Sequence, residues 1–233
     1  PMVSRRLPLK RRCWRRADVF GKGRRAWVVE AARRVGPQHG EYGMIEHAPW
    51  VGGKFAGEGI DGQRIAILGY SAWTPDDHEQ YTVESVRNVI SGAWKKVGFF
   101  NAIAGYFGRP VADFYERVVL FEFVPCSVGG GDQRYAVATP EQAEVGRSRL
   151  LRIVNDHGIE KLLVFSAKAL KDMPPTLEAA SGSAPTLNGT KFKYGHYVRD
   201  DGNRTAVVGL RHPQYAPGGL MRRAVAEAMA LST

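Results

Sequence analysis

The sequence predicts an α/β fold, a three-layer α/β/α sandwich around a central four-stranded parallel sheet. Four short apolar runs rich in β-branched residues alternate with segments of helical periodicity, which is typical of βαβ units with right-handed crossovers. The runs are almost continuously hydrophobic, as expected for parallel strands buried on both faces. They are "RIAIL" at 64–68, "RVVLFEFV" at 117–124, "KLLVF" at 161–165 and "TAVVGL" at 205–210.

Helical signals lie between these runs. After the first run, Thr74-Pro75-Asp76-Asp77 combines a capping threonine, a proline suited to the first helical position and acids for the first turn. The apolar residues that follow recur at helical spacing and predict two helices divided near Gly98. A second start signal, Thr139-Pro140-Glu141-Gln142, precedes an apolar stripe, and a closing helix is expected at about 220–231. The stretch "SGSAPTLNGT" at 181–190 predicts an exposed loop.

Length and composition favour one domain with a basic extension in front of it. A chain of 233 residues with 44% hydrophobic residues can bury one substantial core, which we place at 44–233. Residues 1–25 hold ten Lys/Arg against one acid, which is +9 of the net charge of +10. We expect the extension at 1–43 to be mobile and to contact phosphates, with Trp14 able to stack on a base; the alternative is a solubilising tail. Met44 would make a natural chain start, in which case the extension is an upstream addition.

Composition and motifs exclude several classes of protein. No run approaches the roughly 18 apolar residues of a membrane span, and no signal-peptide pattern is present. Cys13 and Cys126 are too few for an iron–sulfur cluster or a zinc site built on four thiolates. The acids and histidine of 76–79 radiate around a helix start instead of converging, and "GGGDQR" lacks the Walker pattern. We therefore expect a cytoplasmic protein without metal or cofactor.

The segments directly after each strand form the candidate site, because ligands collect at the carboxyl ends of parallel strands. These segments are "GYSAW" (69–73), "PCSVGGGDQRY" (125–135), "SAKAL" (166–170) and "RHPQYAPGG" (211–219). One hypothesis is a serine hydrolase, since Ser71 follows a strand on a sharp turn and His212 comes late in the chain. Asp200 or Asp201 would complete the triad. Trp73 argues against it, because the nucleophile elbow needs a small residue there.

Taken together, these segments resemble the uracil-DNA glycosylase superfamily over about residues 48–230. "RIAILGYSAW" is similar to the superfamily's first strand and water-positioning motif, and "VVLFEFVPCSVGGG" to the second strand, which carries a base-recognising residue. "IVNDHGIEKLLVFSAKAL" is similar to the third helix and strand, and "TAVVGLRHPQYAPGG" to the final strand and its H-P-S-P motif. The resemblance implies a protein that binds a flipped base and hydrolyses the N-glycosidic bond of a deaminated or damaged base, uracil or a related one. Its partner would be single- or double-stranded DNA, or a free nucleobase.

The resemblance also implies a role for each motif residue. Catalysis would fall to His212, as donor to the departing base, and to Ser71, at the water-positioning place. The base would be bound by Gly69, Tyr70, Trp73, Phe100 (or its neighbour Phe99) and Glu122. The DNA would be contacted by Arg134, Arg211, Pro213 and Tyr215.

Three residues depart from the superfamily's pattern. Ser71 is a weaker water activator than Asp or Asn, because a neutral hydroxyl cannot share developing positive charge. Ala72 replaces the usual proline, and Glu122 stands where the classical enzymes place an Asn. A carboxylate only accepts hydrogen bonds, so Glu122 favours a base edge that presents donors. The cysteines of the iron–sulfur type are absent. Two alternatives stay open: a catalytically weak relative that binds nucleic acid or a nucleobase, and a small serine esterase using Ser71 and His212.

Overall fold

The computed structural model describes residues 44–74, 76–94, 97–128, 137–177, 186–187, 190–191 and 193–231. Contacts divide the chain into two units, Pro1–Gly43 and Met44–Thr233, and every described residue belongs to the second. The basic extension predicted at 1–43, with Trp14, lies outside the described residues, and so does Arg134 of the predicted DNA-contacting set.

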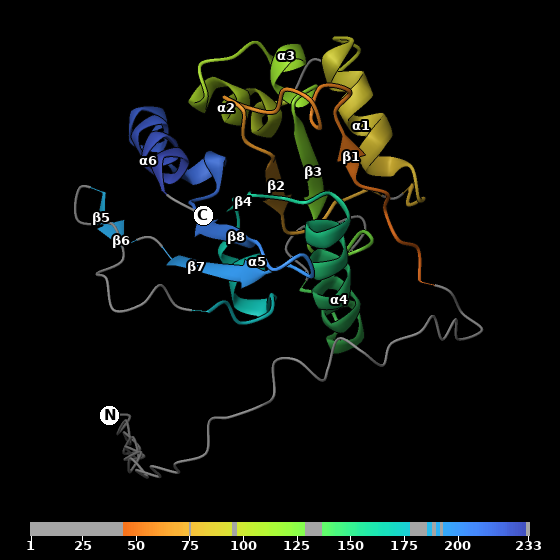
Figure 1. The fold of residues 1–233 in the computed structure, drawn as a ribbon. Helices are drawn as coiled ribbons and strands as arrows, with labels where there is room; N and C mark the ends of the chain where they lie inside the picture. Colours follow the sequence, from red (N-terminus) through yellow and green to blue (C-terminus); the bar gives the residue numbers. More distant parts are fainter. Residues whose placement is uncertain are drawn as a thin grey trace, which may run out of the picture. The chain divides into compact units, whose positions relative to one another are not determined.

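A six-stranded sheet forms the centre of the described unit, in the order β1-β3-β2-β4-β8-β7 (Figure 1). Strands β2, β3, β4 and β8 are parallel to one another, and β1 and β7 pair antiparallel at the two edges. The strands span Trp50–Val51 (β1), Ile65–Gly69 (β2), Val118–Glu122 (β3), Lys161–Val164 (β4), Lys193–Val198 (β7) and Arg204–Gly209 (β8). Thr186–Leu187 (β5) and Thr190–Lys191 (β6) form a separate two-stranded sheet.

The four predicted strands are confirmed as the parallel centre of this sheet, but the predicted total of four strands is wrong. Strand β1 has two residues and is too short to show any periodicity. Strand β7 contains Gly195 and His196, so it lacks the continuous hydrophobicity that marks a central strand. The β5–β6 pair falls largely within 181–190, for which a loop is predicted. Edge strands escape the prediction because they need not be buried on both faces.

The helices of the described residues are α1 (Tyr81–Ile90), α2 (Gly98–Tyr106), α3 (Val111–Tyr115), α4 (Pro140–Asp156), α5 (Ala167–Asp172) and α6 (Gly218–Ala230), with the 3₁₀ turn η2 at Pro213–Tyr215. The predicted division of two helices near Gly98 and the closing helix are confirmed. Thr139 caps α4 as predicted, and its side chain and that of Gln142 form a reciprocal capping box.

The first helix begins later than predicted. Its first residue is Tyr81, and the N-cap Gln80 makes no side-chain cap bond, so Thr74 does not start it. Thr74 Oγ1 instead accepts a hydrogen bond from the amide of Asp76 at 3.1 Å, as in a turn. The carboxylate of Asp77 accepts from the amide of Ser127 in another loop. Local capping signals were overridden here by tertiary partners.

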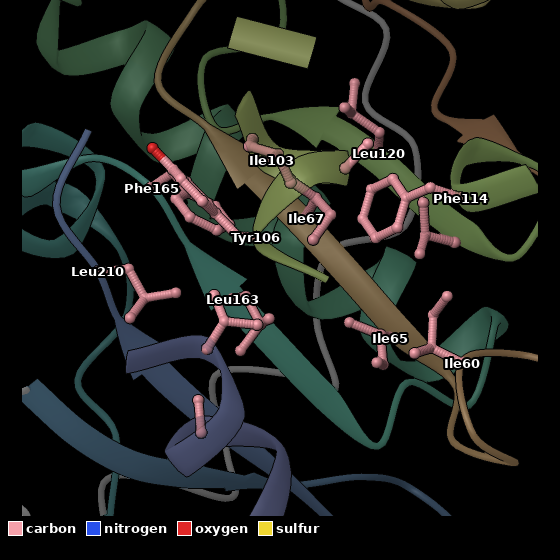
Figure 2. Close-up of a cluster of buried hydrophobic side chains, with 14 of the residues drawn as sticks. Ile60, Ile65, Ile67, Ile103, Tyr106, Phe114, Leu120, Leu163, Phe165 and Leu210 are labelled. Atoms are coloured by element: carbon pink, nitrogen blue, oxygen red, sulfur yellow. The ribbon is translucent and has the colours of Figure 1, made fainter. Parts of the chain in front are cut away.

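Helices cover both faces of the sheet, which produces the predicted three layers (Figure 1). Helices α1, α2, α3 and α6 pack on one face, and α4 and α5 on the other. Along the central strands, alternate side chains pack into one or the other of two hydrophobic cores. In β2, Ile65 and Ile67 join the first core, shown in Figure 2, whereas Ala66 and Leu68 join the second. The central strands are therefore buried on both faces.

The order of the parallel strands places a topological switch between β2 and β4. From β2 the chain crosses through α1, α2 and α3 to β3, on one side of β2. From β3 it returns through α4, on the other face, to β4 on the opposite side of β2. In open α/β sheets, ligands bind outside the carboxyl ends of the strands at such a reversal. The topology therefore indicates the loops after β2 and β4, and the adjacent loops after β3 and β8, as the place where a ligand would bind.

Candidate functional site

The carboxyl ends of the four parallel strands lie side by side and hold the segments expected to form the site. Backbone pairing continues past the regular strands. The amide of Val124, after β3, donates to Tyr70 O at 2.8 Å. The amide of Phe165, after β4, donates to Leu68 O at 2.9 Å. These bonds fix the starts of the three loops relative to one another at the switch point.

Gly69 leaves room at the end of β2. Its partner in the sheet is Glu122, and a Cβ added to Gly69 would have Glu122 Cγ as its near neighbour, at 3.9 Å, which is an ordinary contact. Its φ is not positive. By contrast, a Cβ on Gly146 of α4 would come within 2.6 Å of Phe123 O. Helix packing therefore requires a glycine at 146, whereas the fold does not require one at 69, where a glycine allows a ligand to approach the backbone.

Glu122 is half-buried at the end of β3 and is held from two sides. The hydroxyl of Thr82 in α1 donates to its Oε2 at 2.7 Å. The guanidinium of Arg149 in α4 donates to its carbonyl oxygen at 2.5 Å. Thr82 and Arg149 are both buried. The Glu122 carboxylate is thereby oriented at the carboxyl edge of the sheet, next to Gly69.

A buried polar cluster braces the same edge, and the sequence pattern does not reveal it. His47 is fully buried, and its Nε2 lies 2.5 Å from Asp77 Oδ1. The amide of Ser127 donates to the other oxygen of Asp77 at 3.1 Å, and Arg149 donates to His47 O. The cluster ties the segment before β1 to the loops after β2 and β3. His47 and Asp77 are 30 residues apart in the sequence, and no motif or periodicity links them. Their pairing can therefore be seen only in the folded chain.

Tyr70 is directed toward the face covered by α4 and α5. Its hydroxyl donates to Asp172 Oδ2 at 3.3 Å and accepts from the amide of Ala138 at 3.0 Å. Lys168 Nζ lies 5.3 Å from the centre of its ring, and the ring of Phe123 stacks against it at 6.5 Å. Burial raises the pKa of the Tyr70 phenol. The Tyr70 ring thus has its partners on the α4 and α5 side of the sheet.

The remainder of the loop after β2 is more exposed. Ser71 is half-buried, Ala72 is buried, and the Trp73 side chain is 40% exposed. The Ala72 carbonyl accepts from the amide of Val128 at 3.4 Å, which fixes the turn against the loop after β3. Ser71 and Trp73 are therefore both accessible to solvent, on either side of the buried Ala72.

His212 follows β8 and caps the 3₁₀ turn η2. Its Nδ1 accepts a hydrogen bond from the amide of Gln214 at 3.2 Å. This bond assigns the proton of the neutral imidazole to Nε2, which is then the donor. Burial lowers the pKa of His212. The arrangement favours a neutral imidazole that presents Nε2–H, and the half-buried ring lies at the same sheet edge as Gly69.

Phe99 is the aromatic neighbour of His212. The two ring centres are 5.6 Å apart, at an interplanar angle of 35°. Phe100 packs elsewhere: its ring lies 5.5 Å from that of Tyr115, whose hydroxyl donates to Phe100 O at 3.1 Å. Sequence spacing cannot separate two adjacent phenylalanines, but the structure puts Phe99 beside His212 and turns Phe100 toward α3.

The predicted DNA-contacting residues have different environments. Arg211 is exposed directly after β8. Pro213 is buried and begins η2, where its fixed φ suits the first position of the turn. Tyr215 ends η2, and its side chain is not among the described parts of the chain. Arg211 is thus the member of this set whose described side chain is at the surface.

The proposed hydrolase triad is not assembled. Asp200 and Asp201 lie in the turn between β7 and β8, at the start of β8, whereas His212 follows its end. Six residues of strand separate the two ends, a distance on the order of 20 Å. Asp201 instead accepts from Asn203 and from the buried Arg199, and these hydrogen bonds lower its pKa to about 2. It is a structural group of the hairpin.

Two further features of the described residues bear on the site. They contain no gathering of three or more His, Cys, Asp or Glu side chains that could hold a metal ion. None of the helices in this part of the chain is long and apolar enough to cross a membrane.

A surface pocket at the opposite, amino edge of the sheet is lined by Gln63, Glu160, Lys161 and Leu231, among others. Lys161 there donates to carbonyls at the end of α6, so that pocket is part of a helix cap.

No protein-family model matches the chain, and no curated protein matches it. The functional argument therefore rests on the fold and on the side chains at its carboxyl edge.

Proposed function

We propose that the unit Met44–Thr233 binds a flipped nucleobase at the carboxyl edge of its sheet and hydrolyses the N-glycosidic bond of a deaminated or damaged base in DNA. The observation that carries the proposal is the state of His212. Its Nδ1 accepts from the amide of Gln214, and burial lowers its pKa, so the neutral ring carries its proton on Nε2. The resemblance of the sequence motifs to the uracil-DNA glycosylase superfamily supports the same interpretation.

A neutral donor suits the chemistry of base excision. Cleavage of the N-glycosidic bond leaves an oxocarbenium-like sugar and an anionic base, so a donor aimed at a base oxygen stabilises the transition state more than the ground state. The hydrogen bond from Gln214 orients the His212 ring before the base arrives, so the ring needs no reorganisation during the reaction. His212 would thus act as an electrophilic donor to the leaving base.

The neighbouring groups complete the proposed arrangement. Phe99, beside His212, supplies an aromatic face on which a flipped base can stack. Gly69 leaves room for the base next to the main chain of β2. The hydroxyl of Ser71 would hold the attacking water, with less power than a carboxylate would have.

A strand-cleavage assay tests the proposal. The substrates are single- and double-stranded oligonucleotides that contain uracil, hypoxanthine, xanthine, 5-hydroxymethyluracil, 8-oxoguanine or 7-methylguanine, with alkali treatment to reveal abasic sites. We expect His212→Ala to lower the single-turnover rate by at least about a hundredfold, the usual effect of removing one such donor. The matched control is His157→Ala, which removes a histidine next to β4 at the amino edge. Equal rates for wild type and His212→Ala would contradict the proposed role.

A second function is favoured by a separate observation. The net charge is concentrated in residues 1–25, which leaves +1 for the rest of the chain, and Ser71 is a weak water activator. We infer as the alternative a relative that binds a nucleobase or nucleic acid without hydrolysis. Absence of cleavage for every base, together with binding of an oligonucleotide or nucleoside that His212→Ala weakens, would select this alternative.

A further inference from the structure

The carboxylate of Glu122 is the group that a base lying over Gly69 would meet on the β3 side. The two residues are paired in the sheet, and the Glu122 side chain bounds the space above Gly69, since its Cγ lies 3.9 Å from the place that a Cβ on Gly69 would occupy. A carboxylate in its ionised form has about four lone-pair sites and no donor. The chemistry of this side chain therefore limits which base edges can lie against it.

Two buried neighbours, Thr82 and Arg149, fix the position of Glu122. The hydroxyl of Thr82, which is fully buried, donates to Oε2 at 2.7 Å. The guanidinium of Arg149, 2% exposed, donates to the main-chain oxygen of the same residue and so places a positive charge close by. Glu122 is thus held both by its side chain and by its main chain. Thr82 also prevents the side chain from rotating freely.

We infer that Glu122 selects a base whose edge presents an amino group, as in cytosine or guanine and their damaged forms, and rejects the imide edge of uracil. The inference rests on the proposed function and names the substrate class of that same site. Uracil presents one N–H between two carbonyl oxygens, so either orientation brings an oxygen against the carboxylate. An amino group, or the adjacent N–H and amino group of guanine, donates to the carboxylate instead.

Excision rates across two groups of substrates test the inference. The amino-bearing group is 8-oxoguanine, 7-methylguanine and 5-hydroxycytosine; the imide group is uracil, 5-hydroxymethyluracil and xanthine. We expect the wild type to excise at least one amino-bearing base about tenfold or more faster than uracil, the effect of one good pairing. Glu122→Gln, whose amide can also donate, should reduce that ratio by about tenfold and raise the rate on uracil. Preference for uracil by the wild type, or an unchanged ratio in Glu122→Gln, would overturn the inference.

Thr82 serves as the positioning residue in this scheme. We expect Thr82→Val, which keeps the shape but removes the donor, to lower the ratio of amino to imide excision. The conservative Thr82→Ser should keep that ratio. A purely structural role would lower both rates together and leave the ratio unchanged in both variants, so the ratio separates the two explanations.

Nucleoside binding separates failure of this inference from failure of the proposed function. If no base is excised, the chain is titrated with cytidine, guanosine and uridine and followed by NMR. Tighter binding of cytidine or guanosine, lost in Glu122→Gln, would keep the inference although the glycosylase proposal had failed. Uridine bound as tightly as cytidine, or no binding of the three nucleosides, would overturn it.

Discussion

At the amino edge of the sheet, Lys161 and Arg199 are buried and direct their donors to backbone carbonyls, whereas at the carboxyl edge Glu122 and His212 are only half-buried. Lys161 Nζ donates to the carbonyls of Ala228, Met229 and Leu231 at the end of α6, and burial lowers its pKa.

Arg199 makes the corresponding contacts at the β7–β8 hairpin. It donates to Ile159 O at 2.6 Å and to Arg204 O at 3.1 Å, and its other nitrogen pairs with Asp201. Lys161 and Arg199 thus use their donors on the backbone carbonyls of a helix end and a hairpin, and few of these donors remain for a ligand. At the carboxyl edge, Thr82 and the amide of Gln214 orient Glu122 and His212 while both side chains stay partly exposed. Charge alone therefore does not mark the site, whereas a side chain that is both oriented and partly exposed does.

The largest effect on stability should come from the amino edge. Arg199→Met removes a charged donor from Ile159 O, which keeps the hydroxyl of Thr205 as its other donor, and from Arg204 O. We expect it to lower the free energy of unfolding by about 3 kcal/mol. Urea denaturation followed by circular dichroism measures this change. The control is Arg64→Met at the same edge, where the pair with Glu160 is partly exposed and is worth under about 1 kcal/mol. Equal losses in the two variants would remove the distinction between buried and exposed cations there.

Two glycines should respond differently to an added methyl group. Gly146→Ala forces a Cβ to within 2.6 Å of Phe123 O, and we expect it to cost about 2 kcal/mol of stability. Gly69→Ala meets an ordinary contact at 3.9 Å and should change stability by less than about 0.5 kcal/mol. It should nevertheless weaken nucleoside binding, because the added methyl group occupies the proposed base position. A stable Gly146→Ala, or a Gly69→Ala variant that binds normally, would show that packing and ligand room are assigned to the wrong glycines.

The smallest of the three effects concerns pH. Because burial lowers the pKa of His212, its neutral form should persist until the pH falls below the ordinary value of about 6.5. The unfolded chain binds this proton at a higher pH than the folded chain, so the His212 contribution to stability also declines as the pH falls from about 6.5 toward the lowered pKa. We expect activity, or nucleoside binding, to fall about tenfold per pH unit below that pKa. NMR titration of the His212 ring supplies the pKa, and His212→Gln should lack this inflection.

The central part of the fold could be predicted because it depends on burial along the chain. Strands buried on both faces must be continuously apolar, so four runs of sequence were enough to locate β2, β3, β4 and β8. The capping box at Thr139 is equally local, since both partners lie within one turn. The edge strand β7, which includes His196, was missed because an edge strand need not be buried on both faces. The late start of α1 depends on partners far along the chain, such as Ser127, whose amide donates to Asp77.

The candidate site, like the fold, could be predicted only in part. The α/β class, the positions of the loops after the strands and the residue types there, including Glu122 and His212, could be predicted from the sequence. The folded chain was needed to show that Phe99 and not Phe100 contacts His212, that Thr82 orients Glu122, and that Asp201 is far from His212. Hydrophobic periodicity is a one-dimensional property that survives in the sequence, whereas side-chain partners across 40 residues are set by packing in three dimensions.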